Sequence, residues 1–152
     1  MSSQKLNRAE LRAWLRLVGG MRSLLNALDR QLRDEAGMTH DDYGILSQLR
    51  RSIGRSMRMS DLAREVGFSP SRLSHAVSRM EDKGWITRRH SGEDGRVIEA
   101  HLTDAGAEHA EQVSGAHLVK VRQLVFDTLG ADGARELSEA MGRVGRAADL
   151  DS

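Results

Sequence analysis

"MSDLAREVGFSPSRLSHAVSRMEDKG", residues 59–84, decides the fold of this chain. It encodes a short helix, a tight turn and a second helix. Gly67 can adopt the positive φ that the turn requires, and Ala63 is small where two crossing helices approach each other. Ser69 is placed to cap the second helix, and Pro70 occupies its first position, where a missing N–H costs nothing. The order and spacing of these residues predict a helix-turn-helix.

The second helix of this motif has an apolar face and a polar face. Leu73, Val77 and Met80 recur at helical spacing and are expected to be buried. The other face carries hydroxyls, an imidazole and two guanidiniums, which can hydrogen-bond base edges or phosphates. Its members are Ser69, Ser71, Arg72, Ser74, His75, Ser78 and Arg79. Residues 69–80 contain no acid, whereas a merely solvated face would normally include some. We therefore interpret this helix as a DNA-recognition helix in preference to an ordinary amphipathic one.

A β-hairpin is predicted directly after this helix. Two β-prone stretches, residues 85–90 and 96–102, flank the turn sequence "SGEDG". A hairpin that follows a recognition helix is a wing, and we expect its tip to reach DNA beside that helix. The alternative is a hairpin that only covers the core, through Ile86, Ile98 and Leu102.

Three charged residues of the hairpin are expected at the DNA. Arg96 is the expected probe of the backbone or of a narrow minor groove, whose negative potential attracts arginine. Asp94 lies two residues away and can hold the Arg96 guanidinium in place. Arg89, on the first strand, is a further expected DNA contact.

The segments before the motif are predicted to be helical. One long helix is expected from Ala9 to Ala36, and a second begins after Thr39, with Asp42 as its capping-box partner. The expected buried stripe of this second helix is Ile45, Leu46, Leu49 and Ile53. Residues 51–60 are expected to form a loop, with Ser60 as the cap of the next helix.

The segment after the hairpin is also predicted to be helical. One helix is expected from Thr103 to about Leu129, and a last one from Asp132 to about Ala147. Their apolar residues are Val113, Leu118, Val121, Leu124, Val125, Leu137, Met141 and Val144. Helices of this length cannot pack fully against a small winged-helix body, so a symmetric second copy is the expected partner. The alternative is an intramolecular core.

In this order and spacing, several segments resemble the MarR family of bacterial winged helix-turn-helix regulators. They are Leu62–Ala63, "SPSRLSHAVSRMEDKGWITRR" (residues 69–89), Asp94 and Arg96 with one residue between them, and "LTDAG" (residues 102–106). The resemblance implies a mainly α fold: a winged helix-turn-helix with a two-stranded β-hairpin wing and long N- and C-terminal dimerisation helices. It also implies a homodimer, a palindromic operator in double-stranded DNA and, often, relief of repression by a small ligand.

We expect a single interlocked domain with two functional regions. Residues 1–38 and 103–152 are expected to form the helical dimerisation region, and residues 39–102 the DNA-binding region. The charge of the chain agrees with this division. Residues 50–101 carry 11 basic and 7 acidic residues, net +4, whereas residues 102–152 carry 5 basic and 9 acidic residues, net −4. This basic middle segment suggests a polyanionic partner. The alternative is a surface on which charge is unevenly distributed by chance.

The composition also excludes several classes of protein. The chain has no cysteine, which removes disulfides and thiolate zinc sites. We find no signal-peptide pattern and no run approaching ~18 apolar residues. The expected protein is therefore soluble and cytoplasmic, with no membrane partner.

A small-molecule effector is expected from the resemblance alone. Ser74 and Arg88 match positions that contact aromatic acids in some relatives. Trp14, with two arginines on the same helix, resembles a subset that responds to urate-like ligands. Each residue also has a plainer interpretation: Arg88 can pair with a neighbouring carboxylate or a DNA phosphate, and Trp14 can simply pack.

We find no convincing catalytic or metal-binding pattern. His101, His109 and His117 lie eight residues apart, which does not place two ligands on adjacent helical turns. Ser71 and His75 lack a third orienting group for a hydrolase triad. We expect no enzyme, no cofactor and no metal. Two functions remain: a dimeric, sequence-specific DNA-binding repressor, and a winged-helix protein-interaction module that binds no DNA.

Overall fold

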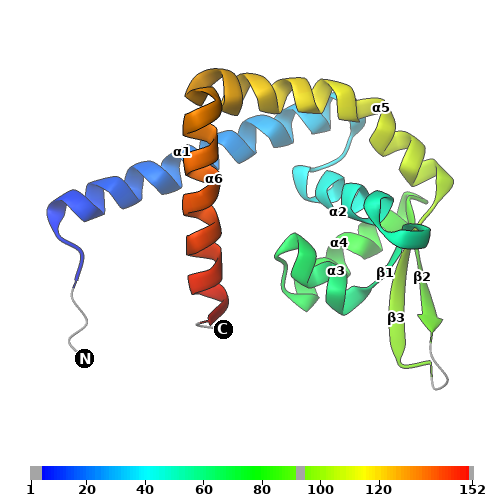
Figure 1. Cartoon of the computed structure of the whole chain (residues 1–152). Coiled ribbons are helices and arrows are strands. Elements are labelled where there is room, and N and C mark those ends of the chain that lie inside the picture. The colour runs from blue at the N-terminus through cyan, green and yellow to red at the C-terminus, as the bar shows by residue number, and fades with distance from the viewer. Residues whose placement is uncertain (1–4, 92–94, 151–152) are drawn as a thin grey trace. The chain divides into compact units, whose positions relative to one another are not determined.

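A computed structural model describes residues 5–91 and 95–150 of the chain. The chain divides into two compact units, residues 1–114 and 115–152. The larger unit holds the whole of the predicted helix-turn-helix and hairpin (Figure 1).

The predicted first helix is confirmed as α1 (Arg8–Ala36). It begins at Asn7, whose side chain accepts the backbone N–H of Glu10 while the Glu10 carboxylate accepts the N–H of Asn7. It ends at Gly37, which adopts a left-handed conformation with φ 61°. Such caps satisfy backbone groups that have no partner within a helix.

The predicted second helix is confirmed as α2 (His40–Arg51), together with its capping box. The N–H of Asp42 donates to the Thr39 hydroxyl at 3.0 Å, and the Asp42 carboxylate accepts the N–H of Thr39 at 3.1 Å. The box fixes the first turn of α2, which carries Asp41 as well as Asp42.

One residue expected in the buried stripe of α2 lies outside the core. Ile45, Leu46 and Leu49 are fully buried, whereas Ile53 is 97% exposed, so that part of the prediction is wrong. The helix ends at Arg51, and the short turn η1 (Ile53–Arg55) has Gly54 at φ 66°. This turn takes Ile53 off the helical stripe.

The predicted helix-turn-helix is confirmed. α3 (Met59–Val66) ends at Gly67, which adopts φ 70°, and α4 (Pro70–Asp82) follows after a short turn. Ser69 caps α4 by accepting a backbone N–H at 3.2 Å. The expected cap at Ser60 is wrong, because α3 already begins at Met59 and has no side-chain cap bond.

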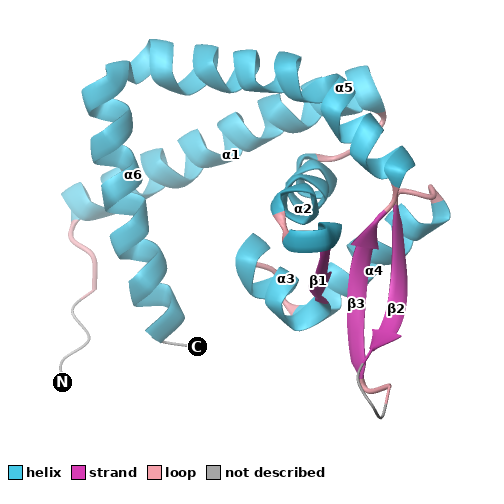
Figure 2. Ribbon diagram, turned by 45° about the vertical axis from the view of Figure 1, so that its right-hand side comes forward, coloured by secondary structure: helices cyan, strands magenta, loops and turns pink. Residues whose placement is uncertain are grey.

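The wing is confirmed, and it belongs to a three-stranded antiparallel sheet (Figure 2). β2 (Ile86–Ser91) pairs with β3 (Val97–Leu102), and β1 (Ser56–Arg58) pairs with the other edge of β3. The expectation of loop throughout residues 51–60 is therefore wrong at β1. A three-residue strand has no alternating pattern of its own and forms because β3 offers it an edge.

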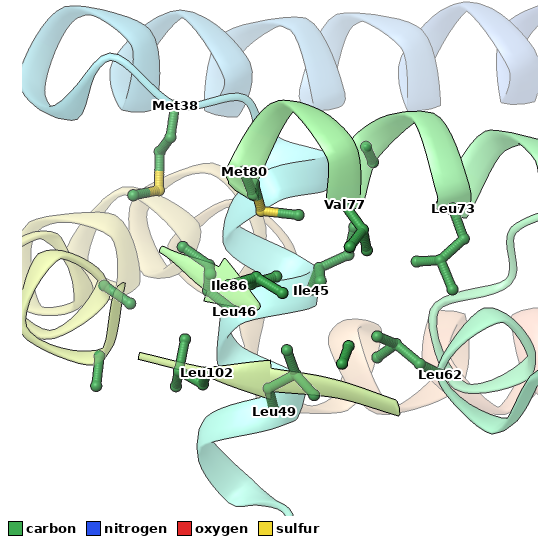
Figure 3. Packing of buried hydrophobic residues seen from close by; sticks show 14 of the residues in the cluster. Met38, Ile45, Leu46, Leu49, Leu62, Leu73, Val77, Met80, Ile86 and Leu102 are labelled. Atoms are coloured by element: carbon green, nitrogen blue, oxygen red, sulfur yellow. The ribbon is translucent and has the colours of Figure 1, made fainter. Parts of the chain in front are cut away.

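The helices α2, α3 and α4 and the base of the sheet enclose one apolar core (Figure 3). The predicted core residues of α4, namely Leu73, Val77 and Met80, are buried. Ile86 and Leu102 of the hairpin are buried as expected, but Ile98 is 38% exposed, so its assignment to the core is wrong. Ile98 pairs with His90 in the outer part of the hairpin, beyond the reach of the core.

The turn after β3 packs tightly against the residue before β2. The Thr103 hydroxyl donates to the Gly84 carbonyl at 2.7 Å and accepts the N–H of Gly106 at 3.0 Å. A Cβ atom on Gly106 would overlap the Trp85 carbonyl oxygen and lie 2.9 Å from the Leu102 side chain. This contact explains the glycine of the "LTDAG" segment.

The smaller unit is helical. It begins at Gly115, within α5 (Asp104–Val121), whose first part belongs to the larger unit. α5 leads into one π turn, η2 (Arg122–Phe126), and then into α6 (Asp127–Leu150). Gly130 has φ 69° and ψ 171°, which breaks α6 and confirms the predicted helix boundary near this position. Within residues 5–91 and 95–150, no helix combines the length and the hydropathy needed to span a bilayer.

Candidate nucleic-acid interface

The polar residues of α4 divide into two groups. Leu73, Ala76, Val77 and Met80 are buried on one side of the helix. At about 100° per residue, Ser71, Ser74, His75 and Ser78 lie on the side away from them. We call these four the outward face; Ser71, Ser74 and His75 are exposed and Ser78 is half-buried. Arg72 and Arg79, which we call the arginine flank, are also exposed and share one edge of the helix.

The arginine flank is paired with the first turn of α2. The Arg72 guanidinium lies 2.6 Å from the Asp41 carboxylate and 4.0 Å from the centre of the Phe68 ring. The Arg79 guanidinium lies 3.4 Å from the Asp42 carboxylate, whose side chain is only 3% exposed. These pairs could not be predicted from the sequence, because the partners are 31 and 37 residues apart. No local pattern could have indicated them.

α4 and the wing are joined by Glu81 and Arg88. The Glu81 carboxylate accepts the backbone N–H of Arg88 at 2.9 Å and its Nε–H at 2.8 Å, and a second guanidinium nitrogen lies at 2.6 Å. The side-chain hydrogen bond from Arg88 is the largest effect on this carboxyl and outweighs its partial burial, so the pKa of Glu81 lies below its ordinary value. This double contact fixes the angle at which β2 leaves the helix.

Arg89 lies on the outer face of the wing sheet. It pairs across the strands with Glu99, which in turn pairs with Arg58 of β1. Residues paired in this way lie on the same face of a sheet, about 5 Å apart. Arg58 therefore joins Arg89 as an exposed cation of the outer face. The place of Arg58 on this face could not be predicted from the sequence, because β1 was expected to be a loop.

The predicted contacts of the wing tip are described only in part. Arg96 is exposed just before β3, and Gly95 beside it has φ 65°. The Gly95 carbonyl lies 2.8 Å from Nδ1 of His90 and closes the end of the hairpin. Asp94 lies outside the described residues.

A crevice of about 510 Å³ opens beside the arginine flank. Its walls come from α1, α4 and the start of α2, and consist of Leu25, Asn26, Asp29, Arg33, Thr39, His40, Asp41, Arg72 and Arg79. Partial burial raises the pKa of Asp29, but hydrogen bonds from Arg33 and from the His40 backbone outweigh it, so the pKa lies below its ordinary value. The crevice thus brings together charges of both signs.

The three expected effector residues lie on three different elements. Trp14 is 53% exposed on α1, Ser74 belongs to the outward face, and Arg88 is paired with Glu81. None of them lines the crevice.

Two of the histidines considered as metal ligands, His101 and His109, contact neighbouring residues of the fold. His109 stacks on Trp85 with ring centres 4.6 Å apart, and its Nε2 lies 2.8 Å from the Ala36 carbonyl. His101 lies in β3, with Nε2 3.5 Å from the Glu99 carboxylate. In the part of the chain that the structure describes, no group of three His, Cys, Asp or Glu side chains is arranged to hold a metal.

The fold of the chain matches that of solved transcriptional regulators. The crystal structure of Sco3205, a MarR family transcriptional regulator from Streptomyces coelicolor in complex with DNA, is 38% identical, covers 96% of this chain and 91% of that one, and superimposes with a TM-score of 0.91. The chain belongs to the MarR family.

Other comparisons agree with membership of the MarR family. The MarR family model matches residues 36–97. AbsC, a MarR family regulator from Streptomyces coelicolor, is 34% identical over 97% of this chain and 99% of that one, with a TM-score of 0.88. The transcriptional repressor MdtR of Bacillus subtilis is 30% identical over 106 residues, which are 69% of this chain and 64% of MdtR. All three of these relatives, Sco3205, AbsC and MdtR, are described as transcriptional regulators or repressors.

Proposed function

We propose that this chain is a dimeric repressor that binds a palindromic operator in double-stranded DNA through α4 and the wing. The observation that carries the proposal is the outward face of α4, which is free of acidic residues and exposed at Ser71, Ser74 and His75. It is set beside a wing whose outer face carries Arg58 and Arg89 on either side of Glu99. The proposed DNA contacts are Ser69, Ser71, Arg72, Ser74, His75, Ser78, Arg79, Arg89, Asp94 and Arg96. The related Sco3205 was solved in complex with DNA, which supports DNA binding by this chain.

The proposed dimer rests on apolar side chains that the single chain leaves exposed. On α1 they are Leu11, Trp14, Leu15, Leu17, Met21 and Leu25, and in the smaller unit they include Leu118, Val119, Phe126, Leu137 and Val144. A symmetric second copy removes such surfaces from water, and two copies match a palindromic operator. Residues 1–38 and 103–152 are the proposed dimerisation region.

We further propose that a small aromatic or urate-like acid releases the repressor from DNA. Trp14, Ser74 and Arg88 are the proposed contacts, and the crevice beside the arginine flank is a second place where an anion would meet guanidinium groups. At Arg88, a ligand carboxylate has to displace the carboxylate of Glu81, because Glu81 already forms an ion pair with the Arg88 guanidinium. A ligand carboxylate can pair bidentately with the guanidinium of Arg88.

A gel shift across a salt series tests the DNA-binding proposal against the protein-interaction alternative. Affinity for DNA should fall steeply with salt as counterions are released. Footprinting should then show two half-sites about one helical turn, ~34–36 Å, apart. Binding that ignores salt, or a single unsymmetrical footprint, contradicts the proposal.

Two matched variants locate the interface. Ser71→Glu adds a negative charge to the outward face at a position in the first turn of α4, where the helix dipole tolerates an acid. Gln48→Glu adds the same charge to α2, outside the proposed DNA contacts and the proposed dimerisation region, where Arg51 already hydrogen-bonds the side chain at 2.9 Å. The first should abolish DNA binding while the second leaves it near the wild-type level. Equal effects would place the interface elsewhere.

A further inference from the structure

The first turn of α2 faces the recognition helix with two consecutive carboxylates. Asp41 pairs with Arg72 at 2.6 Å and Asp42 pairs with Arg79 at 3.4 Å. These two arginines are the only lysine or arginine residues between positions 69 and 80. Both formal positive charges of this stretch are therefore compensated within the chain, on the same helix that the proposed function brings to a polyanion.

The two carboxylates differ in what else they do. Asp42 is buried and closes the capping box with Thr39, so its loss would also damage the start of α2. Asp41 is different, because its side chain is 43% exposed and Thr39, not Asp41, provides the cap. Asp41 can therefore be changed without removing the capping box.

Arg72 is held in one orientation as well as neutralised. Asp41 contacts one guanidinium nitrogen, and the Phe68 ring lies 4.0 Å from the guanidinium carbon. A planar cation held by a carboxylate and a ring keeps its remaining donors aimed in a fixed direction. The Arg72 side chain is still 57% exposed, so those donors can reach a partner outside the chain.

We propose that Asp41 is a specificity-determining residue of DNA binding that acts as a positioning residue through Arg72. Binding to DNA of any sequence is almost wholly electrostatic, so a masked cation weakens it directly. Binding to an operator also uses contacts in fixed geometry, and a guanidinium that is already oriented loses less side-chain freedom when it makes them. Asp41 thus lowers non-specific affinity more than operator affinity. This proposal rests on the proposed DNA-binding function.

The test begins with the wild-type protein. An operator is selected from random-sequence duplexes, and dissociation constants are then measured for that operator and for a scrambled duplex over a salt series. Asp41→Asn should bind the scrambled duplex about two- to fivefold more tightly, the range expected for one half-exposed ion pair. Its salt slope should steepen by about one ion. The affinity for the operator should rise by a smaller factor, so the ratio of operator affinity to scrambled-duplex affinity falls.

Asp61→Asn is the matched control. Asp61 pairs with Arg64 at 2.8 Å on α3, so this variant loses the same charge from the same body without touching Arg72. It should change both affinities by one common factor. In an Arg72→Gln background, Asp41→Asn should no longer change the ratio, because its partner is absent. Asp41→Ser, which suits the first turn of a helix, repeats the measurement if the Asn variant folds poorly in thermal melts.

The outcomes separate this proposal from the proposed function. If the wild-type protein selects no sequence and its DNA affinity does not change with salt concentration, both the proposed function and the role of Asp41 are overturned. A wild-type protein that selects an operator, with an unchanged affinity ratio in both Asp41 variants, overturns only the role of Asp41. An Asp41 effect that persists without Arg72 also overturns it, because the residue would then act as a general negative charge.

Discussion

At its base, the β2–β3 hairpin buries Ile86, Ala100 and Leu102 against α2 and α4, whereas its outer half exposes Arg89 and more than a third of Ile98. The same two strands form both halves, and the strand pairing continues without interruption from Ile86–Leu102 to Ser91–Val97. Hydrogen bonding between strands is therefore common to both ends, and the contact with the core is what differs. The base of the hairpin therefore determines stability, and the outer half is left exposed for the proposed DNA contacts.

The largest expected effect comes from two isoleucines of this sheet. Ile86→Ala should lower the free energy of unfolding by about 2–5 kcal/mol, because a fully buried side chain leaves a cavity. Ile98→Ala should lower it by less than about 1 kcal/mol, since Ile98 is already partly in water. Denaturant unfolding of the two variants measures the difference. Similar losses would show that base and tip are equally part of the core.

The second effect concerns the close contact between Gly106 and the Trp85 carbonyl group, at the base of the hairpin. Gly106→Ala should destabilise the protein by about 1–3 kcal/mol, because its Cβ would overlap the Trp85 carbonyl oxygen. Gly44→Ala is the control, since Gly44 lies in α2 with no atom near its missing Cβ. That change should stabilise the helix by up to ~1 kcal/mol. A stable Gly106→Ala protein would mean that the turn can move away from Trp85.

The third effect belongs to the tip and should be seen only with DNA. Arg96→Ala should weaken operator binding at least about tenfold, the equivalent of a ~1.5 kcal/mol hydrogen bond to a charged group. The salt slope should fall by about one ion, and the melting temperature should stay close to that of the wild type. Arg51→Ala removes the same charge from an exposed position at the end of α2, outside the proposed DNA contacts and the proposed dimerisation region, and serves as the control. A lower melting temperature with unchanged DNA binding would make the hairpin purely structural.

The smallest effect concerns the ion pair of Glu81 and Arg88, which connects α4 with β2. The folded pKa of Glu81 is lowered, so its pairing with Arg88 stabilises the protein above the ordinary carboxyl pKa of 4.5 and is lost as pH falls through the lower folded value. Glu81→Gln should therefore cost up to about 1 kcal/mol at neutral pH. Its difference from the wild type should disappear in acid. Unfolding at a series of pH values measures this.

The matched variant for this last comparison is Glu65→Gln on α3. Glu65 is exposed, so its loss should change stability little at any pH. A constant difference between wild type and Glu81→Gln from neutral to acid pH would contradict the ionic role of Glu81.

Much of the fold and part of the candidate site could be predicted because local signals carry them. The Thr39–Asp42 cap, the Ser69–Pro70 start of α4 and the Gly67 turn are each specified within a few residues, and all three are confirmed. Helical periodicity likewise separated the buried side of α4 from its outward face. These features depend on backbone conformation and on burial along one helix.

Other features could not be predicted, because they depend on residues far apart in the chain. β1 forms only when β3 offers an edge, so neither the strand nor Arg58 had a local signal. Ile53 matches the periodicity of α2 but lies past the point where that helix ends.

By itself, therefore, the sequence determined the helix-turn-helix, the wing and the acid-free stretch of residues 69–80, whose residues suggest DNA binding. Tertiary structure alone decided which arginines of α4 and of the wing are already paired. Arg72 meets Asp41 and Arg88 meets Glu81 only after α2, α4 and β2 have packed around the core. The physical reason is that caps and helical periodicity act over a few residues, whereas an ion pair requires two side chains to be brought within a few ångströms by the whole fold.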